Sequence, residues 1–189
     1  MSDRAHLIIF DSPIGFCGFV HIDQVLQTLR VGFESRQSCR QAFETFEGDL
    51  HCPEQPNAWE SNFADRLVSS LHSDHDRDDD FSDIEIADGH LTDFQKAVSD
   101  ACRQIGFGKT VSYGELAQKV GHPGAARAVG SVMSRNRFLL IVPCHRVLGS
   151  NGLGGYAAPS GTGTKKQLLE IEGHIWPSPR KTETQTALF

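Results

Sequence analysis

Ile141-Val142-Pro143-Cys144-His145-Arg146-Val147 is the stretch on which the interpretation of this chain depends. It ends an apolar run, Phe138 to Val142, that predicts a buried strand. The predicted strand ends at Pro143, and the next three residues carry a thiol, an imidazole and a guanidinium. A thiol beside an imidazole is a common way to form a thiolate near neutral pH. We therefore expect Cys144 to have a pKa below the ~8.5 of a free thiol, although a cysteine simply packed at a strand end stays open.

Two helix starts lie upstream of this stretch. Thr92 with Gln95 forms a capping box, which begins a helix with an apolar stripe. Ser112 with Glu115 forms a second capping box, which opens a short helix. A Gly/Pro turn separates this short helix from another one over about residues 125–134. A short helix, a tight turn and a second helix are typical of a helix-turn-helix.

The second helix of this pattern is nearly bare on one side. Ala126, Ala128 and Gly130 are small, Arg127 lies among them, and Arg135 follows closely. Such a face can pack tightly against another helix or can approach a DNA backbone. The basic side chains beside it favour DNA, bound with little sequence preference through the phosphates and the narrow groove.

The net charge of −6 hides an uneven distribution along the chain. Residues 1–90 hold 18 acidic and 6 basic residues, a balance of −12, and residues 91–189 hold 6 acidic and 12 basic residues, a balance of +6. A positive half joined to a negative half predicts that one surface meets a polyanion. Residues 74–88 contain eight acids and one arginine, which predicts a solvated acidic linker.

The first half gives no chemical signal. Leu7–Phe10 and Phe16–Ile22 predict strands, and Leu26 to Phe33 predicts a third strand or a short helix. From Ala58 to Leu71 the apolar residues have helical spacing. We expect a support domain at 1–90, which includes the acidic linker, and a second domain at 91–189 that carries the chemistry.

Composition excludes several classes of protein. No apolar run approaches the ~20 residues that span a bilayer, and we expect neither a signal peptide nor membrane contact. Five irregularly spaced cysteines indicate a reducing compartment, so we expect a cytoplasmic protein, nuclear in a eukaryote. We also expect no metal. One alternative, without typical ligand spacing, is a zinc site built from Cys17, Cys39, Cys52 and one of His6, His21 and His51.

Further residues around Cys144 carry a resemblance to a known family. They are Ser112-Tyr113, Glu115-Leu116-Ala117, Ala126-Arg127-Ala128-Val129-Gly130, Met133, Asn136, Gly152, Gly155-Tyr156, Leu168-Leu169 and Glu172-Gly173. In this order and spacing, roughly residues 91–173 resemble the methylated-DNA–protein-cysteine methyltransferases, also called 6-O-alkylguanine-DNA alkyltransferases. The resemblance implies an α+β chain, in which a small ribonuclease H-like α/β domain precedes a mostly helical domain with a helix-turn-helix.

The resemblance also implies an activity, which is DNA repair by direct reversal. An alkyl group moves from the 6-oxygen of guanine in duplex DNA to Cys144, once and without a cofactor. His145 would be the base, and Glu172 would orient it. Neighbours in an extended chain point apart, so we expect a bridging water between Cys144 and His145. Arg146 would form a structural ion pair or hydrogen bonds.

Other roles are implied in the same way. Tyr113 would rotate a backbone phosphate and protonate the leaving guanine, Arg127 would fill the space of the extruded nucleotide, and Asn136 would hold the turns around the active-site strand. The implied substrate pocket consists of Met133, Leu139, Val147, Tyr156 and Ser160. Leu139 stands in a segment where the family usually has prolines. The loop after Tyr156 lacks the usual guanine-contacting serine, unless Ser160 supplies it.

Three other functions stay open. A non-catalytic binder of alkylated DNA that recruits repair factors would lack the cysteine, commonly replaced by tryptophan. A cysteine hydrolase would not need a helix-turn-helix. A helix-turn-helix regulator needs side chains that read base edges, and the second helix lacks them. We expect double-stranded DNA with alkylated guanine as the partner, no obligate protein partner, and a monomer.

Overall fold

The N-terminal half of the chain is built around a four-stranded sheet in the computed structural model, which describes residues 4–72, 79–150 and 152–175. The strands are β1 (Ala5–Phe10), β2 (Phe16–Ile22), β3 (Val25–Phe33) and β4 (Leu50–His51), in the order β3-β2-β1-β4. The first three pair antiparallel, and β4 pairs parallel with β1. β1 and β2 confirm the two strand predictions for this half, and β3 shows that the segment from Leu26 is a strand and not a short helix.

The alternation of side chains along β1 and β2 separates two cores. Leu7 and Val20 pair across the strands and face α1 (Arg36–Gln41), together with Phe43. Ile8 and Phe19 form the next pair and face the opposite side. There they meet α2 (Ala58–Ser70), whose first turn has a capping box from Asn57 and Glu60. This two-residue periodicity is what places helices on both faces of the sheet.

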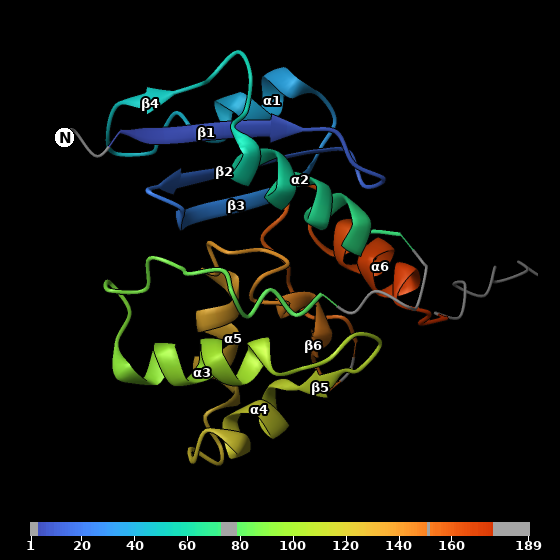
Figure 1. The fold of residues 1–189 in the computed structure, drawn as a ribbon. Coiled ribbons are helices and arrows are strands. Elements are labelled where there is room, and N and C mark those ends of the chain that lie inside the picture. Colours follow the sequence, from blue (N-terminus) through green and yellow to red (C-terminus); the bar gives the residue numbers. More distant parts are fainter. Residues whose placement is uncertain (1–3, 73–78, 151, 176–189) are drawn as a thin grey trace, which may run out of the picture.

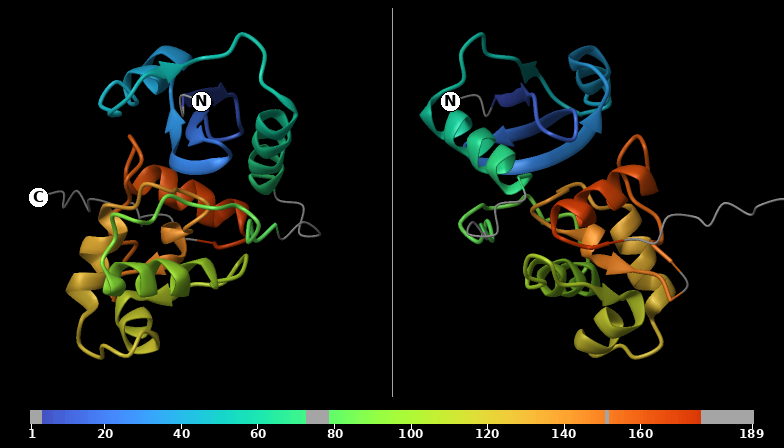
Figure 2. Two further views of the ribbon diagram at one scale, coloured as in Figure 1. Left: turned by 60° about the vertical axis from the view of Figure 1, so that its left-hand side comes forward. Right: turned by 90° about the vertical axis from the view of Figure 1, so that its right-hand side faces the viewer.

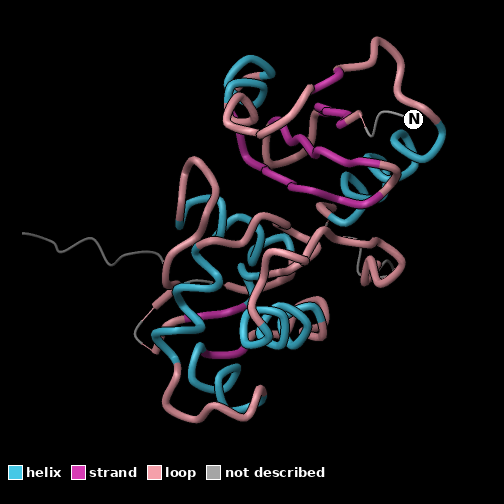
Figure 3. Tube along the Cα trace, turned by 90° about the vertical axis from the view of Figure 1, so that its left-hand side faces the viewer, coloured by secondary structure: helices cyan, strands magenta, loops and turns pink. Residues whose placement is uncertain are grey.

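The C-terminal half is mostly helical. It contains α3 (Asp93–Arg103), β5 (Val111–Ser112), α4 (Tyr113–Lys119), α5 (Ala126–Ser134), the 3-10 turn η1 (Cys144–Arg146), β6 (Val147–Leu148) and α6 (Thr162–Ile171). Both predicted capping boxes are present, Thr92 with Gln95 on α3 and Ser112 with Glu115 on α4. Figures 1 and 2 show α6 between the sheet and helices α3, α4 and α5. Figure 3 shows that the long strands all lie in the N-terminal half.

One continuous core joins the two halves. Buried side chains run from the sheet through α2 and into the helical half, among them Phe19, Leu29, Phe63, Val98, Met133, Cys144 and Leu168. No helix within the described ranges has both the length and the apolar character needed to cross a membrane.

The edge of β3 holds a segment that lies close to Cys144 in sequence. Leu29 N–H donates to Arg137 O at 2.7 Å, and Leu139 N–H donates to Leu29 O at 3.2 Å. The Thr28 hydroxyl donates to the same Arg137 carbonyl at 3.0 Å. The sheet therefore fixes the backbone at 137–139 directly.

The predicted strand from Phe138 to Val142 is wrong. Phe138 makes a single bridge with Leu29, and the chain then closes a turn in which Val142 N–H donates to Phe138 O at 2.8 Å. Leu140 adopts a left-handed conformation with φ of 72°. The apolar run is buried because it fills the junction of the two halves, which hydropathy alone does not distinguish from a strand.

The acidic segment also differs from its prediction. Residues 73–78 lie outside the described residues. Within 79–88 the segment is a loop in which Asp80, Asp83 and Glu85 are exposed, as predicted, but other side chains pack against the fold. Asp79 and Asp83 both accept hydrogen bonds from Arg66, at 2.6 to 2.9 Å. Phe81 and Ile84 are buried. The density of acidic residues predicted a solvated loop, but two buried apolar side chains and the contacts with Arg66 hold part of it against the fold.

We predict that Arg66→Ala lowers the free energy of unfolding by about 1–3 kcal/mol, because two carboxylates lose a bidentate partner. Arg4→Ala is the matched control. Its ion pair with Asp49 is more than half exposed on both sides, so its loss should cost about 0–1 kcal/mol. Urea unfolding of both variants measures the difference, and equal losses would contradict a special role for Arg66.

Candidate active site

Cys144 lies at the start of the 3-10 turn η1, at the junction of the two halves. Its side chain is buried, with 3% of the residue exposed. The Asn136 amide donates to Cys144 Sγ at 3.2 Å and to Val142 O at 2.8 Å, and its carbonyl accepts Phe138 N–H at 2.9 Å. Asn136 therefore ties the 138–142 turn to the thiol. Arg135 is the C-cap of α5, so Asn136 lies just beyond the end of the helix.

His145 follows in the same turn and is fully buried. Its Nε2 lies 2.8 Å from Glu172 Oε1. Burial lowers the pKa of His145, against the opposing effect of Glu172, so the imidazole is neutral at pH 7. An ionised carboxylate accepts only, so Nε2 carries the proton and Nδ1 keeps its lone pair. Among the described residues, no protein atom hydrogen-bonds this Nδ1.

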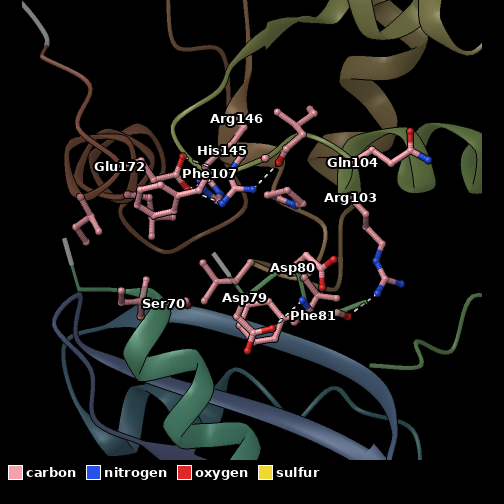
Figure 4. Close-up of a pocket in the computed structure, with 18 residues that line it drawn as sticks. Ser70, Asp79, Asp80, Phe81, Arg103, Gln104, Phe107, His145, Arg146 and Glu172 are labelled. Atoms are coloured by element: carbon pink, nitrogen blue, oxygen red, sulfur yellow. Dashed lines mark hydrogen bonds and ion pairs between the residues drawn. The ribbon is translucent and has the colours of Figure 1, made fainter. Parts of the chain in front are cut away.

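Glu172 is the shared acceptor behind the site (Figure 4). It follows α6 and accepts from His145, from Arg146 Nε at 2.9 Å and from Gly108 N–H at 3.2 Å. Burial alone would raise the pKa of Glu172, but His145 and Arg146 outweigh it and lower the pKa to about 2. Gly108 has a φ of 64°, a conformation that favours glycine. The predicted ion pair of Arg146 is present.

The pKa of the Cys144 thiol lies above its ordinary value. Burial raises the pKa of Cys144 to about 11, although the Asn136 amide and the Lys165 ammonium oppose the shift. The expectation of a pKa below that of a free thiol is therefore wrong for the free protein, because it considered the neighbouring imidazole and not the burial. The prediction of an extended backbone at Cys144 and His145 is also wrong, since η1 is a 3-10 turn.

Tyr113 reaches the same region from α4. The parallel pair of β5 and β6 brings Val111 beside Val147, and Tyr113 follows directly at the start of α4. Gly154 packs on the Tyr113 ring so closely that a Cβ there would lie 2.7 Å from the hydroxyl. Burial raises the pKa of Tyr113, and Cys144 raises it further. The phenol therefore keeps its proton at neutral pH.

Sequence reasoning missed Lys165, which is fully buried. Its ammonium donates to Val147 O at 2.6 Å and to Gly155 O at 3.3 Å, and it lies 5.8 Å from the centroid of the Tyr113 ring. One signal was available in the sequence. Lys165 lies three and four residues before the buried Leu168 and Leu169, so it shares their helix face.

The predicted DNA-binding residues lie along α5 and just after it. Arg127, Ala128 and Arg135 are exposed, and Ala126 and Gly130 are half-buried. A Cβ built on Gly130 would meet open space. Val129 and Met133 are buried, so α5 turns one apolar face inward and keeps its small residues and Arg127 toward the surface.

The predicted pocket residues are only partly brought together. Met133, Leu139 and Val147 are buried in the core around Cys144. The Tyr156 ring lies 6.3 Å from that of His145, and its buried hydroxyl finds no partner among the described residues. Ser160 is exposed and lines a hollow with Asp11, Thr164 and Gln167, so it does not face the thiol.

A cavity of about 170 Å³ lies behind His145, on the side of Glu172. Its walls come from the end of α2, the segment 79–81, residues 103–107 and α6. Figure 4 shows Arg103 and Phe81 at its rim, where Arg103 donates to Phe81 O at 2.8 Å. The cavity therefore borders His145, the expected base, and does not border the Cys144 thiol.

The described residues contain one group of metal-type side chains whose ligand atoms lie mutually within 4.8 Å, formed by His6, His21 and Glu60. It contains no cysteine, unlike the zinc alternative from the sequence. Glu60 Oε1 accepts from His6 Nδ1 at 2.7 Å and from His21 Nε2 at 2.9 Å. Gln24 N–H donates to His21 Nδ1 at 3.2 Å, which keeps the proton on Nε2. A metal would need the opposite tautomer, so this cluster is arranged as a hydrogen-bonded network.

Comparison with known proteins agrees with this geometry. Residues 93–174 match the family model described as 6-O-methylguanine DNA methyltransferase, DNA binding domain. The methylated-DNA–protein-cysteine methyltransferase of Mycobacterium tuberculosis (strain CDC 1551 / Oshkosh) is 37% identical over 168 residues, 88% of this chain and 92% of that protein. The protein of the same name from Methanosarcina acetivorans is 52% identical over 83 residues, 43% of this chain, and the match spans about half of that relative, 52% of its length.

Solved structures show the same likeness over most of the chain. The crystal structure of Mycobacterium tuberculosis OGT in complex with DNA superposes with a TM-score of 0.69 at 35% identity, covering 88% of this chain and 92% of that one. The O6-methylguanine-DNA methyltransferase from Pyrococcus kodakaraensis KOD1 gives a TM-score of 0.66 at 25% identity, covering 90% and 99%. The mixed α/β fold is that of these structures, and the chain belongs to the methylated-DNA–protein-cysteine methyltransferase family.

Proposed function

We propose that this protein repairs DNA by moving an alkyl group from the 6-oxygen of guanine to its own Cys144. The observation that carries the proposal is the buried Cys144 thiol, held by Asn136 and placed beside a neutral His145 bonded to Glu172. All of these residues lie within the segment that matches the family model. The presence of the cysteine argues against a non-catalytic binder of alkylated DNA.

The proposed reaction is a displacement at the alkyl carbon. His145 Nδ1 takes the thiol proton, through a bridging water, and the resulting thiolate attacks the carbon. The sulfur–carbon bond forms as the carbon–oxygen bond breaks, and the departing guanine takes a proton from Tyr113. The proton held by His145 later restores the phenol. Glu172 keeps the Nδ1 lone pair available throughout, because its carboxylate holds the proton on Nε2.

We propose that α5 enters the narrow groove of DNA and that Arg127 occupies the space of the extruded nucleotide. The exposed Ala128 and half-buried Gly130, next to Arg127, support this by letting the backbone come close to the phosphates. The substrate would be duplex DNA with an alkylated guanine. The M. tuberculosis relative, which was crystallised in complex with DNA, supports DNA as the partner. Met133, Val147 and Tyr156 would surround the alkyl group, and Leu139 would back them.

We further propose that residues 1–90 act as a support domain for residues 91–189, in a monomer. The hydrogen bonds from Thr28 and Leu29 to the 137–139 backbone support this role. The strand order β3-β2-β1-β4, with β4 parallel to β1, supports a ribonuclease H-like sheet for this domain.

We predict single-use transfer. A thioether is stable in water, so each molecule should gain one methyl group on Cys144 from an oligonucleotide that carries 6-O-methylguanine, and activity should end after one equivalent. Intact-mass and peptide mass spectrometry measure the site and the stoichiometry. Cys144→Ala should show no transfer, and continued turnover by the parent would contradict the proposal.

For DNA binding, Arg127→Ala should slow repair of duplex DNA more than it slows reaction with the free base 6-O-benzylguanine, because only the duplex requires base extrusion. Arg4→Ala, which removes a charge just before β1, serves as the control and should change neither rate. Binding of the parent should weaken steadily as salt rises. Equal losses on both substrates would assign Arg127 to folding.

Glu172→Gln should lower the free energy of unfolding at pH 7 by about 2–4 kcal/mol, since His145 and Arg146 lose a buried charged partner. The folded pKa of about 2 lies below the ~4.3 of an unfolded glutamate. The stabilisation is therefore present above pH ~4.3 and disappears as the pH falls toward 2. Urea unfolding at pH 7 and pH 3 measures this, with the exposed Glu170→Gln as control. A difference that does not shrink at pH 3 would contradict the assignment.

A further inference from the structure

The sheet of the N-terminal half has an edge that its own strands cover only in part. β1 pairs with β2 over residues 6–10, whereas β4 pairs with β1 at Ala5 and His6 alone. Over residues 7–10, no strand of the described chain pairs with the outer side of β1. Alternate residues of this open edge therefore present backbone N–H and C=O groups that have no partner in a ladder.

The segment after β4 does not continue along the open edge. β4 ends at His51, and Cys52 and Pro53 follow. A proline has no N–H to donate to a ladder, so it favours the end of strand pairing. The space that a longer β4 would occupy beside β1 is therefore left to another group.

A hollow of about 540 Å³ follows the open edge. Leu7, Ile8 and Ile9 line it from β1, and Cys52 and Pro53 line it from the segment after β4. Its volume lies within the roughly 300–1,000 Å³ of typical binding sites. The hollow thus combines unpaired backbone groups with apolar side chains on which a ligand can pack.

Helix α1 gives the hollow a positively charged wall. Arg36 and Arg40 both line it, are exposed, and lie four residues apart, so they share one face of the helix. Arg4 and Arg66 of the same half form ion pairs, but no described carboxylate lies at ion-pair distance from Arg36 or Arg40. Glu54 is the one acidic residue among those that line the hollow. The wall is therefore a local positive site in a half whose balance is −12.

We propose that the open edge of β1 binds an extended acidic peptide of a partner protein by strand addition. The peptide backbone pairs with residues 7–10, alternate side chains enter the hollow, and carboxylates pair with Arg36 and Arg40. An extended peptide fits better than a compact anion, because it supplies partners to the strand edge and to the charged wall at once.

The position of this edge suits a partner that binds while the protein is on DNA. Figure 1 shows α1 and β4 at the end of the molecule opposite α4. A peptide bound beside β1 would leave α5, the helix proposed to enter the DNA groove, uncovered. The proposal does not depend on alkyl transfer, and it would stand if that transfer failed.

The first test uses a short fluorescein-labelled peptide of alternating glutamate and valine, with binding measured by fluorescence anisotropy. This peptide should bind saturably and more weakly as salt rises. A peptide with lysine in place of glutamate should not bind. A third peptide, in which the backbone nitrogens of the valines are methylated, keeps every charge but loses N–H donors, and it should bind at least ~10-fold more weakly if strand pairing contributes.

The second test locates the charged contacts. Arg36→Ala and Arg40→Ala should each weaken binding by about 2- to 5-fold, as expected for exposed ion pairs, and the double variant by about 10-fold. Arg30→Ala is the matched control. Arg30 is also exposed and belongs to the sheet, but it does not line the hollow, so its loss should leave the affinity unchanged.

Cys52 reports on the hollow itself. Of the five cysteines it is the one that is not buried, and it lines the hollow. Saturating acidic peptide should slow the alkylation of Cys52 by iodoacetamide, followed by peptide mass spectrometry. The double arginine variant at the same peptide concentration should show less protection.

Several results would overturn the proposal. They are the absence of binding, equal binding of the lysine peptide or of the methylated peptide, and unchanged labelling of Cys52 when the peptide is bound. Sedimentation of the free protein as a dimer with Cys52 already protected would also overturn it, because a second copy of the chain would then cover the edge.

Discussion

The carboxylate of Glu172 is the contact on which the site depends. One buried side chain accepts from His145, Arg146 and the backbone of Gly108, so it joins η1, the loop after α3 and the end of α6. Arg146 also donates to the carbonyl of Ile105, which extends the same network to the end of α3. The buried charge thus fixes the orientation of the imidazole and the packing of the surrounding segments together.

The second constraint comes from the sheet. Thr28 and Leu29 form hydrogen bonds with the backbone at 137–139. The adjoining Asn136 donates its amide N–H to the Cys144 sulfur. The turn from 138 to 142 contains a left-handed Leu140, a conformation that a leucine does not adopt without support. The edge strand supplies that support from a part of the chain more than a hundred residues away.

Local patterns predicted much of this fold. The strands of the first half, α2 and the two capping boxes follow from side-chain alternation, helical spacing and short-range hydrogen bonds. The turn at Phe138–Val142 could not be predicted, because it is stabilised by β3 and not by its own residues. The contact of His145 with Glu172 followed only from the family resemblance. Lys165 was missed because a lysine in an amphipathic helix is normally solvated, and only the tertiary fold shows that its face is closed.

The burial of Cys144 has a consequence for how long the protein remains useful. Burial raises the pKa of Cys144 to about 11, so the thiol keeps its proton at pH 7. Peroxides and stray electrophiles consume exposed thiolates, and here they meet a closed, protonated sulfur. A molecule that can react once has no means of recovering from an accidental reaction. The low reactivity of the protonated thiol therefore protects Cys144 from side reactions until an alkylated base is bound.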